Sequence, residues 1–123
     1  MVNLAVVMGN LAKPAQVRAW PSGLWRAAFD LQVRAADRSL GTVPVALFDE
    51  PEQVSQWATG QELLAIGRVR RRFFRIGGAT QSRTEMVAEQ VLPLEQNASV
   101  YTALVQVGCT IAGVLEDLFR QEQ

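Results

Sequence analysis

The chain has 123 residues, of which 49% are hydrophobic and 20% are charged, a composition typical of one folded domain and not of a disordered chain. Twelve basic and twelve acidic residues cancel, which excludes a wholly basic, histone-like protein but leaves room for a local basic patch. With no histidine and one cysteine, the sequence offers neither a disulfide framework nor a Cys/His zinc site, and it lacks the commonest general base of enzymes. We therefore expect no enzyme activity, no metal and no cofactor.

Five apolar stretches predict β-strands along the first three-quarters of the chain. The second stretch is the clearest, because Trp25 and Phe29 lie on one side of an alternation with polar residues, as in a half-buried strand. Gly9 indicates a bulge or a close approach of two backbones near the end of the first strand. A polar loop is expected at 35–41 and a hairpin loop at 76–82. The predicted strands cover residues 2–11, 24–34, 43–48, 62–74 and 83–92.

A short helix is predicted between the third and fourth strands. Asp49 and Glu50 form an acidic start, Pro51 suits a first helical turn, and Gly60 is the expected stop after about two turns. Trp57 lies on the apolar face of this helix and is expected to plug the barrel. Five strands with one helix at this place are the arrangement of an OB barrel, so the sequence predicts an all-β, five-stranded OB-fold.

Residues 97–123 differ from the preceding domain of residues 1–96, because apolar residues recur there at alternating spacings of four and three. This heptad seam predicts a C-terminal α-helix that needs a partner surface, for oligomerisation or docking. The uncharged stretch 98–115 raises the possibility of a membrane span, but its polar side chains and the lack of flanking basic clusters disfavour one. The seam consists of Val100, Leu104, Val107, Ile111, Val114 and Leu118.

The strongest local signal is a run of arginine and phenylalanine at 68–75. On an extended strand Arg70, Arg72 and Phe74 share one face with Arg68. Guanidinium groups neutralise phosphates and an aromatic ring stacks a base, so the run favours single-stranded nucleic acid; a solubilising edge strand is the alternative. Trp20 is either an exposed stacking platform or a cap on the barrel end. Other cationic residues could line a groove with this run, or be ordinary solvated surface: Lys13, Arg18, Arg26, Arg34 and Arg38.

Six short segments occur in the order and at the spacing of a known family. They are Val2-Asn3 with 6–11, Val17-Arg18 with Pro21-Ser22-Gly23, Val45-Ala46-Leu47-Phe48, Gly60-Gln61-Glu62, Ile66-Gly67-Arg68-Val69 with Arg72, and 84–89. Through these segments the chain resembles bacterial single-stranded DNA-binding proteins from Val2 to about Leu94. The resemblance implies an OB-fold that oligomerises, usually as a homotetramer, and wraps single-stranded DNA without sequence preference.

By residue, the resemblance implies that Phe48 and Phe74 stack bases. Two further positions that are aromatic in the family lie near Ala36 and Thr42 and are not aromatic here, and a heptad helix stands where the family has a flexible tail with an acidic tip. From the residues and the resemblance together, the expected nucleic-acid-binding set is Phe48, Phe74, Arg70, Arg72, Arg68, Arg75, Arg18, Trp20, Lys13 and Arg34.

The expected function is sequence-independent binding and protection of single-stranded DNA in replication, recombination or repair. The alternative is a divergent OB-fold adaptor, similar to primosomal proteins, that acts mainly through protein contacts and binds DNA weakly. The expected partners are single-stranded DNA, further copies of the chain in a homotetramer or dimer, and replication or repair proteins. The expected location is the cytoplasm, associated with the nucleoid.

Overall fold

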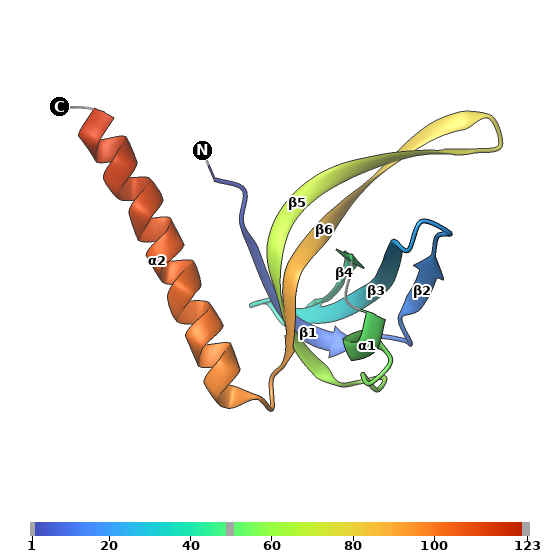
Figure 1. Cartoon of the computed structure of the whole chain (residues 1–123), viewed down its shortest axis with the longest axis horizontal. Helices are drawn as coiled ribbons and strands as arrows, with labels where there is room; N and C mark the ends of the chain where they lie inside the picture. Colours follow the sequence, from blue (N-terminus) through green and yellow to red (C-terminus); the bar gives the residue numbers. More distant parts are fainter. Residues whose placement is uncertain (1, 49–50, 122–123) are drawn as a thin grey trace.

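The computed structural model describes residues 2–48 and 51–121 and is dominated by β-strands, with one long helix at its C-terminal end (Figure 1). The elements follow one another in this order: β1 (Ala5–Leu11), β2 (Gln16–Ala19), β3 (Trp25–Arg34), β4 (Leu40–Phe48), α1 (Pro51–Val54), β5 (Glu62–Ile76), β6 (Ala79–Pro93) and α2 (Asn97–Gln121).

The strands form one closed sheet with the order β1-β5-β6-β4-β3-β2, in which β1 also pairs with β3. All neighbours are antiparallel except β4 and β6, which run parallel where Val45 lies opposite Met86. β1 and β2 pair with successive parts of β3, at Leu31 and at Ala28, and so act as one interrupted strand. The result is a closed five-stranded barrel, as predicted, and it is consistent with an OB-like fold.

The structure corrects three local expectations. The loop predicted at 76–82 is a two-residue turn at Gly77 and Gly78, whose φ angles of 57° and 81° suit a tight hairpin, so both strands continue to it. β4 begins at Leu40 rather than at residue 43. β2 was not predicted. Lys13 and Pro14 indicated that the first strand ends there, whereas in the structure they only interrupt it before β2.

The predicted two-turn helix between the third and fourth predicted strands is not shown. One turn, α1, is helical, and the predicted start at Asp49 and Glu50 lies outside the described residues. Trp57, three residues after α1, is nevertheless buried, with its ring centroid 5.3 Å from that of Phe29 in an edge-to-face contact. The expectation that both aromatic residues belong to the core is confirmed.

The core lies inside the barrel and is built by the alternation of each strand. The inward positions of β3 include Leu31, which is fully buried, and those of β5 and β6 include Leu63 and Met86. Gly9 allows β1 to cross close to β3, because a Cβ atom there would lie 2.5 Å from the carbonyl oxygen of Gln32. The close approach predicted at this glycine is therefore confirmed.

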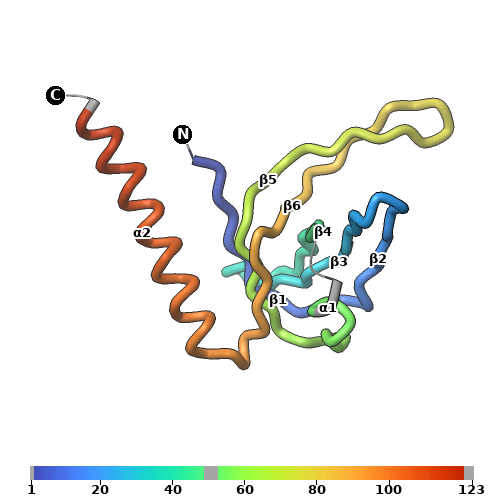
Figure 2. Tube along the Cα trace, viewed as in Figure 1, coloured from blue at the N-terminus to red at the C-terminus, as the bar shows by residue number. Residues whose placement is uncertain are grey.

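The first half of α2 packs against the outside of the barrel. Leu64 and Ile66 of β5 point away from the interior and form a second buried cluster with Ala103 of α2. Farther along, the helix leaves the barrel at an open angle to β1 (Figures 1 and 2), and Ile111 and Leu118 are 43% and 46% exposed. The predicted C-terminal helix is confirmed, and its own barrel covers only its first half.

Candidate nucleic-acid interface

One outer face of the barrel collects residues from five strands because their registers align them, with Arg18 of β2 opposite Arg26 of β3. Arg26 of β3 lies opposite Phe48 of β4, and Arg70 of β5 lies opposite Glu85 of β6. The parallel pairing of β4 with β6 joins these two pairs across the closing seam of the barrel. Because side chains opposite each other in a sheet share a face, arginines distant in sequence meet on this surface. We call this surface the arginine face. It consists of Arg18, Trp20, Arg26, Phe48, Arg70, Arg72, Phe74, Arg83 and Glu85.

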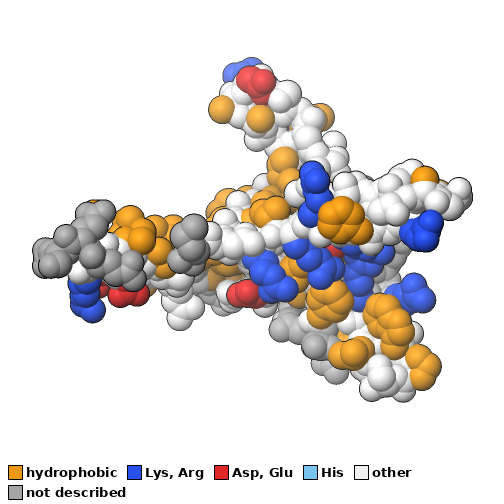
Figure 3. All heavy atoms as spheres, turned by 90° about the horizontal axis from the view of Figure 1, so that it is seen from above, with side chains coloured by type: hydrophobic (Ala, Val, Ile, Leu, Met, Phe, Trp, Pro, Cys, Tyr) orange, Lys and Arg blue, Asp and Glu red, His pale blue; other side chains and the backbone are white. Residues whose placement is uncertain are grey.

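Three arginines of this face each lie over an aromatic ring. The guanidinium carbon of Arg18 is 5.1 Å from the ring centroid of Trp20, that of Arg70 is 5.6 Å from Phe48, and that of Arg72 is 5.9 Å from Phe74. These distances are within the range of cation–π contacts. Figure 3 shows basic side chains interleaved with hydrophobic ones over this side of the barrel.

Glu85 lies at the centre of the arginine face and is only 4% exposed. Its Oε1 atom accepts a hydrogen bond from Nε of Arg70 at 2.9 Å and lies 2.8 Å from Nη2 of the same residue. Its Oε2 atom is 3.3 Å from Nη2 of Arg26. A buried carboxylate with two arginines from different strands fixes the direction of both guanidinium groups.

Arg26 has an unusual environment for a cation. Burial lowers its pKa, the positive charges of Arg72, Arg70 and Arg83 lower it further, and only Glu85 acts in the opposite direction. Within the described part of the chain, its buried Nε atom has no hydrogen-bond partner. The positive charge here is therefore only partly compensated.

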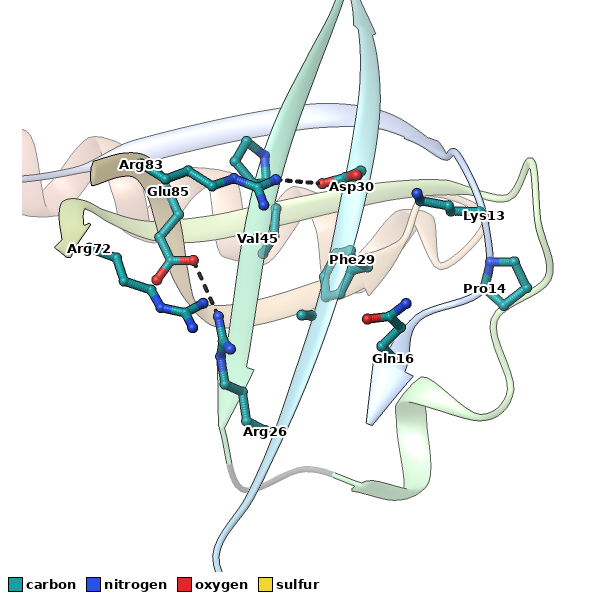
Figure 4. Close-up of a pocket in the computed structure, with 12 residues that line it drawn as sticks. Lys13, Pro14, Gln16, Arg26, Phe29, Asp30, Val45, Arg72, Arg83 and Glu85 are labelled. Carbon is teal, nitrogen blue, oxygen red and sulfur yellow. Dashed lines mark hydrogen bonds and ion pairs between the residues drawn. The ribbon is translucent and has the colours of Figure 1, made fainter. Parts of the chain in front are cut away.

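A cavity of about 370 Å³ opens beside this cluster (Figure 4). Arg26, Arg72 and Glu85 stand on one side of it, and Lys13 and Gln16 on the other. Arg83 reaches across from β6 and pairs with Asp30 of β3, with 3.3 Å between Nη2 and Oδ1. The cavity is polar and cationic, unlike the mostly apolar pockets of typical small-molecule sites.

Seven residues of the expected binding set occur on or beside the arginine face. The side chains of Trp20 and Phe48 are 38% and 36% exposed, so both rings are partly open to solvent. These seven are Lys13, Arg18, Trp20, Phe48, Arg70, Arg72 and Phe74.

The other three residues of the expected set point elsewhere or make other contacts. Arg34 lies near Met8 and Glu62, at the end of β3 opposite to Arg26. Arg68 is 4.0 Å from Glu89. Arg75 donates a hydrogen bond to the carbonyl oxygen of Gly78, at the tip of the β5–β6 hairpin.

Sequence reasoning did not include Glu85, Asp30 and Arg83 in the site, and for Arg26 it left open both a place in the groove and ordinary solvated surface. The alternation of Arg83 and Glu85 with inward Met86 carried a signal that these side chains point outward. Their meeting with Arg26 depends on the β4–β6 register, which no local pattern of the sequence contains.

The helix residues of the predicted seam divide into two groups. Val100, Leu104 and Val107 pack against the barrel cluster around Leu64, whereas Ile111 and Leu118 stay exposed and Val114 is intermediate between these extremes. By length and composition alone, the helix Asn97–Arg120 is also long and apolar enough to cross a membrane, and 6% of an 18-residue apolar window within it is buried.

The described residues hold no cluster of three or more histidine, cysteine or acidic side chains arranged to bind a metal. Comparison of the chain with protein-family models finds no match, and comparison with curated proteins finds none either. The resemblance given by its six segments therefore stays a prediction that rests on the residues of the chain itself.

Proposed function

We propose that the protein binds single-stranded DNA, without sequence preference, on the arginine face. The observation that supports this most directly is the set of three arginine–aromatic pairs on one outer side of the barrel. Bases of a single strand stack on the open rings, at about 1–3 kcal/mol for each base, while the guanidinium groups neutralise the phosphates between them. A duplex cannot stack its bases on these rings, because its bases are already stacked and paired with one another.

The cellular role that follows is stoichiometric protection of exposed strands during replication, recombination or repair, in the cytoplasm and on the nucleoid. The barrel is then an OB-fold whose outer face between β3, β4 and the β5–β6 hairpin carries the strand. The positions near Ala36 and Thr42 supply no additional ring, so fewer bases are stacked than in the family that the sequence resembles.

A fluorescence titration tests this proposal, since Trp20 lies on the arginine face while Trp25 and Trp57 are buried. Oligo-dT should quench the emission, and Trp20→Phe should remove most of that change. A duplex of equal length should quench weakly. Absence of binding to oligo-dT at low salt would contradict the proposal.

The second candidate is an adaptor that binds DNA weakly and acts through protein contacts. The observation in its favour is that three arginines of the face are already occupied by carboxylates, Arg26 and Arg70 by Glu85 and Arg83 by Asp30. Each such contact reduces the charge offered to phosphates. Micromolar or weaker affinity for oligo-dT at physiological salt would favour the adaptor.

We also propose that the chain self-associates through the distal half of α2. Ile111, Leu115 and Leu118 are exposed there, and they continue the helix beyond the part that its own barrel covers. Helix pairing between copies would bury these side chains. A dimer or tetramer would place several arginine faces within reach of one strand.

A further inference from the structure

The geometry points to a discrete anion site in the cavity beside Glu85: we propose that it holds a single phosphate group between Arg26, Arg72, Arg83 and Lys13. This inference adds to the proposed function, because it places one phosphate of the strand at a defined position. The anion site does not depend on the proposed function, because a free phosphate ion carries the same kind of charge and hydrogen-bond acceptors as a phosphate of the strand.

The charge of the lining is the first argument. Four cationic side chains, Lys13, Arg26, Arg72 and Arg83, border the cavity, against the two carboxylates Asp30 and Glu85. Glu85 is moreover shared with Arg70 from outside the cavity. The cavity therefore has an excess of positive charge that a phosphate would compensate.

The free donors are the second argument. The buried Nε of Arg26 lacks a partner, and Arg72 and Lys13 make no ion pair among the described residues. A buried donor without an acceptor is costly, at about 1–3 kcal/mol, unless a ligand or water supplies one. Phosphate oxygens accept several hydrogen bonds at once and suit the fork of a guanidinium group.

Preorganisation is the third argument. Glu85 holds Arg26 at 3.3 Å, and Asp30 holds Arg83 at the same distance, so both guanidinium groups are directed before any ligand arrives. Figure 4 shows the guanidinium ends of Arg26 and Arg72 gathered next to Glu85. The cavity, of about 370 Å³, is near the small end of the roughly 300–1,000 Å³ of ligand pockets, which fits a small ion or one nucleotide phosphate.

Inorganic phosphate is the probe, titrated into the whole protein by calorimetry against chloride at equal ionic strength. We expect a saturable heat of binding with one phosphate for each chain. Above the dissociation constant, Tm should rise with the logarithm of the phosphate concentration. An excluded salt also stabilises the protein, but it gives no saturable heat. Absence of a saturable heat, or no difference from chloride in either measurement, would overturn the proposal.

Two variants and a control locate the site. Arg72→Gln and Lys13→Gln remove cations from opposite sides of the cavity, and each should weaken phosphate binding. For Arg72→Gln we expect a loss of about tenfold or more, because the variant loses a charged hydrogen bond to the phosphate. Arg71→Gln removes the neighbouring charge on the other face of β5 and should leave binding unchanged. Equal phosphate affinity in all three variants and the wild type would exclude this cavity as the site.

A competition experiment separates this inference from the proposed function. If a strand places a phosphodiester in the cavity, phosphate should displace oligo-dT more strongly than chloride does at equal ionic strength. Phosphate binding without any oligo-dT binding would leave a free-anion site and contradict the proposed function. Oligo-dT binding without phosphate binding would contradict only the present inference.

Discussion

The two halves of β5 follow the same alternation and carry opposite chemistry on the outside of the barrel. In the first half, Leu64 and Ile66 point outward and are covered by α2. In the second half, Arg68, Arg70 and Arg72 occupy the outward positions and stay at least partly exposed. One strand thus divides the outer surface into an apolar face used for internal packing and a basic face left for a ligand. The comparison shows that outward position alone does not indicate a binding residue.

The largest effect is expected from removing Glu85, the buried carboxylate of β6 that pairs with the arginines of the basic face. Glu85→Ala leaves Arg26 and Arg70 facing each other without an anion, and we expect a loss of about 3 kcal/mol in the free energy of unfolding, measured with urea. Glu89→Ala is the matched control, because Glu89 is 69% exposed and its 4.0 Å pair with Arg68 contributes about 0–1 kcal/mol. Equal losses in the two variants would show that Glu85 is not an organising group.

The next largest effect concerns strand binding. Arg70→Ala with Arg72→Ala should weaken binding to oligo-dT and flatten its salt dependence, by about 0.7 in log–log slope for each phosphate that the variant no longer neutralises. The control is Arg34→Ala with Arg71→Ala, which removes the same number of arginines away from the arginine face. A change of slope that is the same in both double variants would mean that net charge, and not this face, attracts the strand.

The apolar half is tested through the helix that covers it. Leu104→Ala should reduce the free energy of unfolding by about 1–2 kcal/mol, because Leu104 packs partly buried against the cluster of Leu64 and Ile66. In the monomer, at protein concentrations too low for helix pairing between copies, Leu118→Ala on the exposed distal half of α2 should change it by less than about 0.5 kcal/mol. If both variants unfold alike, the two halves of the helix are not energetically distinct.

The exposed residues on the distal half of α2 should contribute least to folding and most to the proposed assembly. Ile111→Asp with Leu118→Asp alters only exposed positions of α2, so the monomer should stay folded while light scattering reports a lower mass. Replacing Leu104 in this experiment would disturb barrel packing as well, which makes it the less informative choice. An unchanged mass would remove the proposed helix-mediated assembly.

The sequence predicted the five-stranded barrel and the C-terminal helix because their signals are local, but it did not predict β2, and the two-turn helix it predicted is not shown. Alternation predicted the strands, with the inward placement of Phe29, and the position of Trp57 predicted its burial. The length of the β5–β6 hairpin was underestimated, because Gly77 and Gly78 are compatible with a long loop as well as with a two-residue turn.

The site was only partly predictable. Arg70 and Phe74 were found through their basic and aromatic character, but the contact of Arg70 with Phe48 joins β5 to β4. Glu85 was not predicted, because a single carboxylate in a strand resembles ordinary solvent-facing charge. Its contact with Arg70 lies within the β5–β6 hairpin, but its contact with Arg26 requires the pairing of β4 with β6. Local pattern predicts which side chains face outward, whereas long-range register decides which of them meet.

The parallel pairing of β4 with β6 has a consequence for the order of folding. β5 and β6 are joined by a two-residue turn, so this hairpin can form from local contacts, whereas the β4–β6 pair needs a much larger loop to close first. Arg26 of β3 reaches Glu85 of β6 only across that late seam. The contact of Arg26 with Glu85, and with it the cavity beside them, therefore depends on a closed barrel, whereas the pair of Arg70 and Glu85 lies within the β5–β6 hairpin itself.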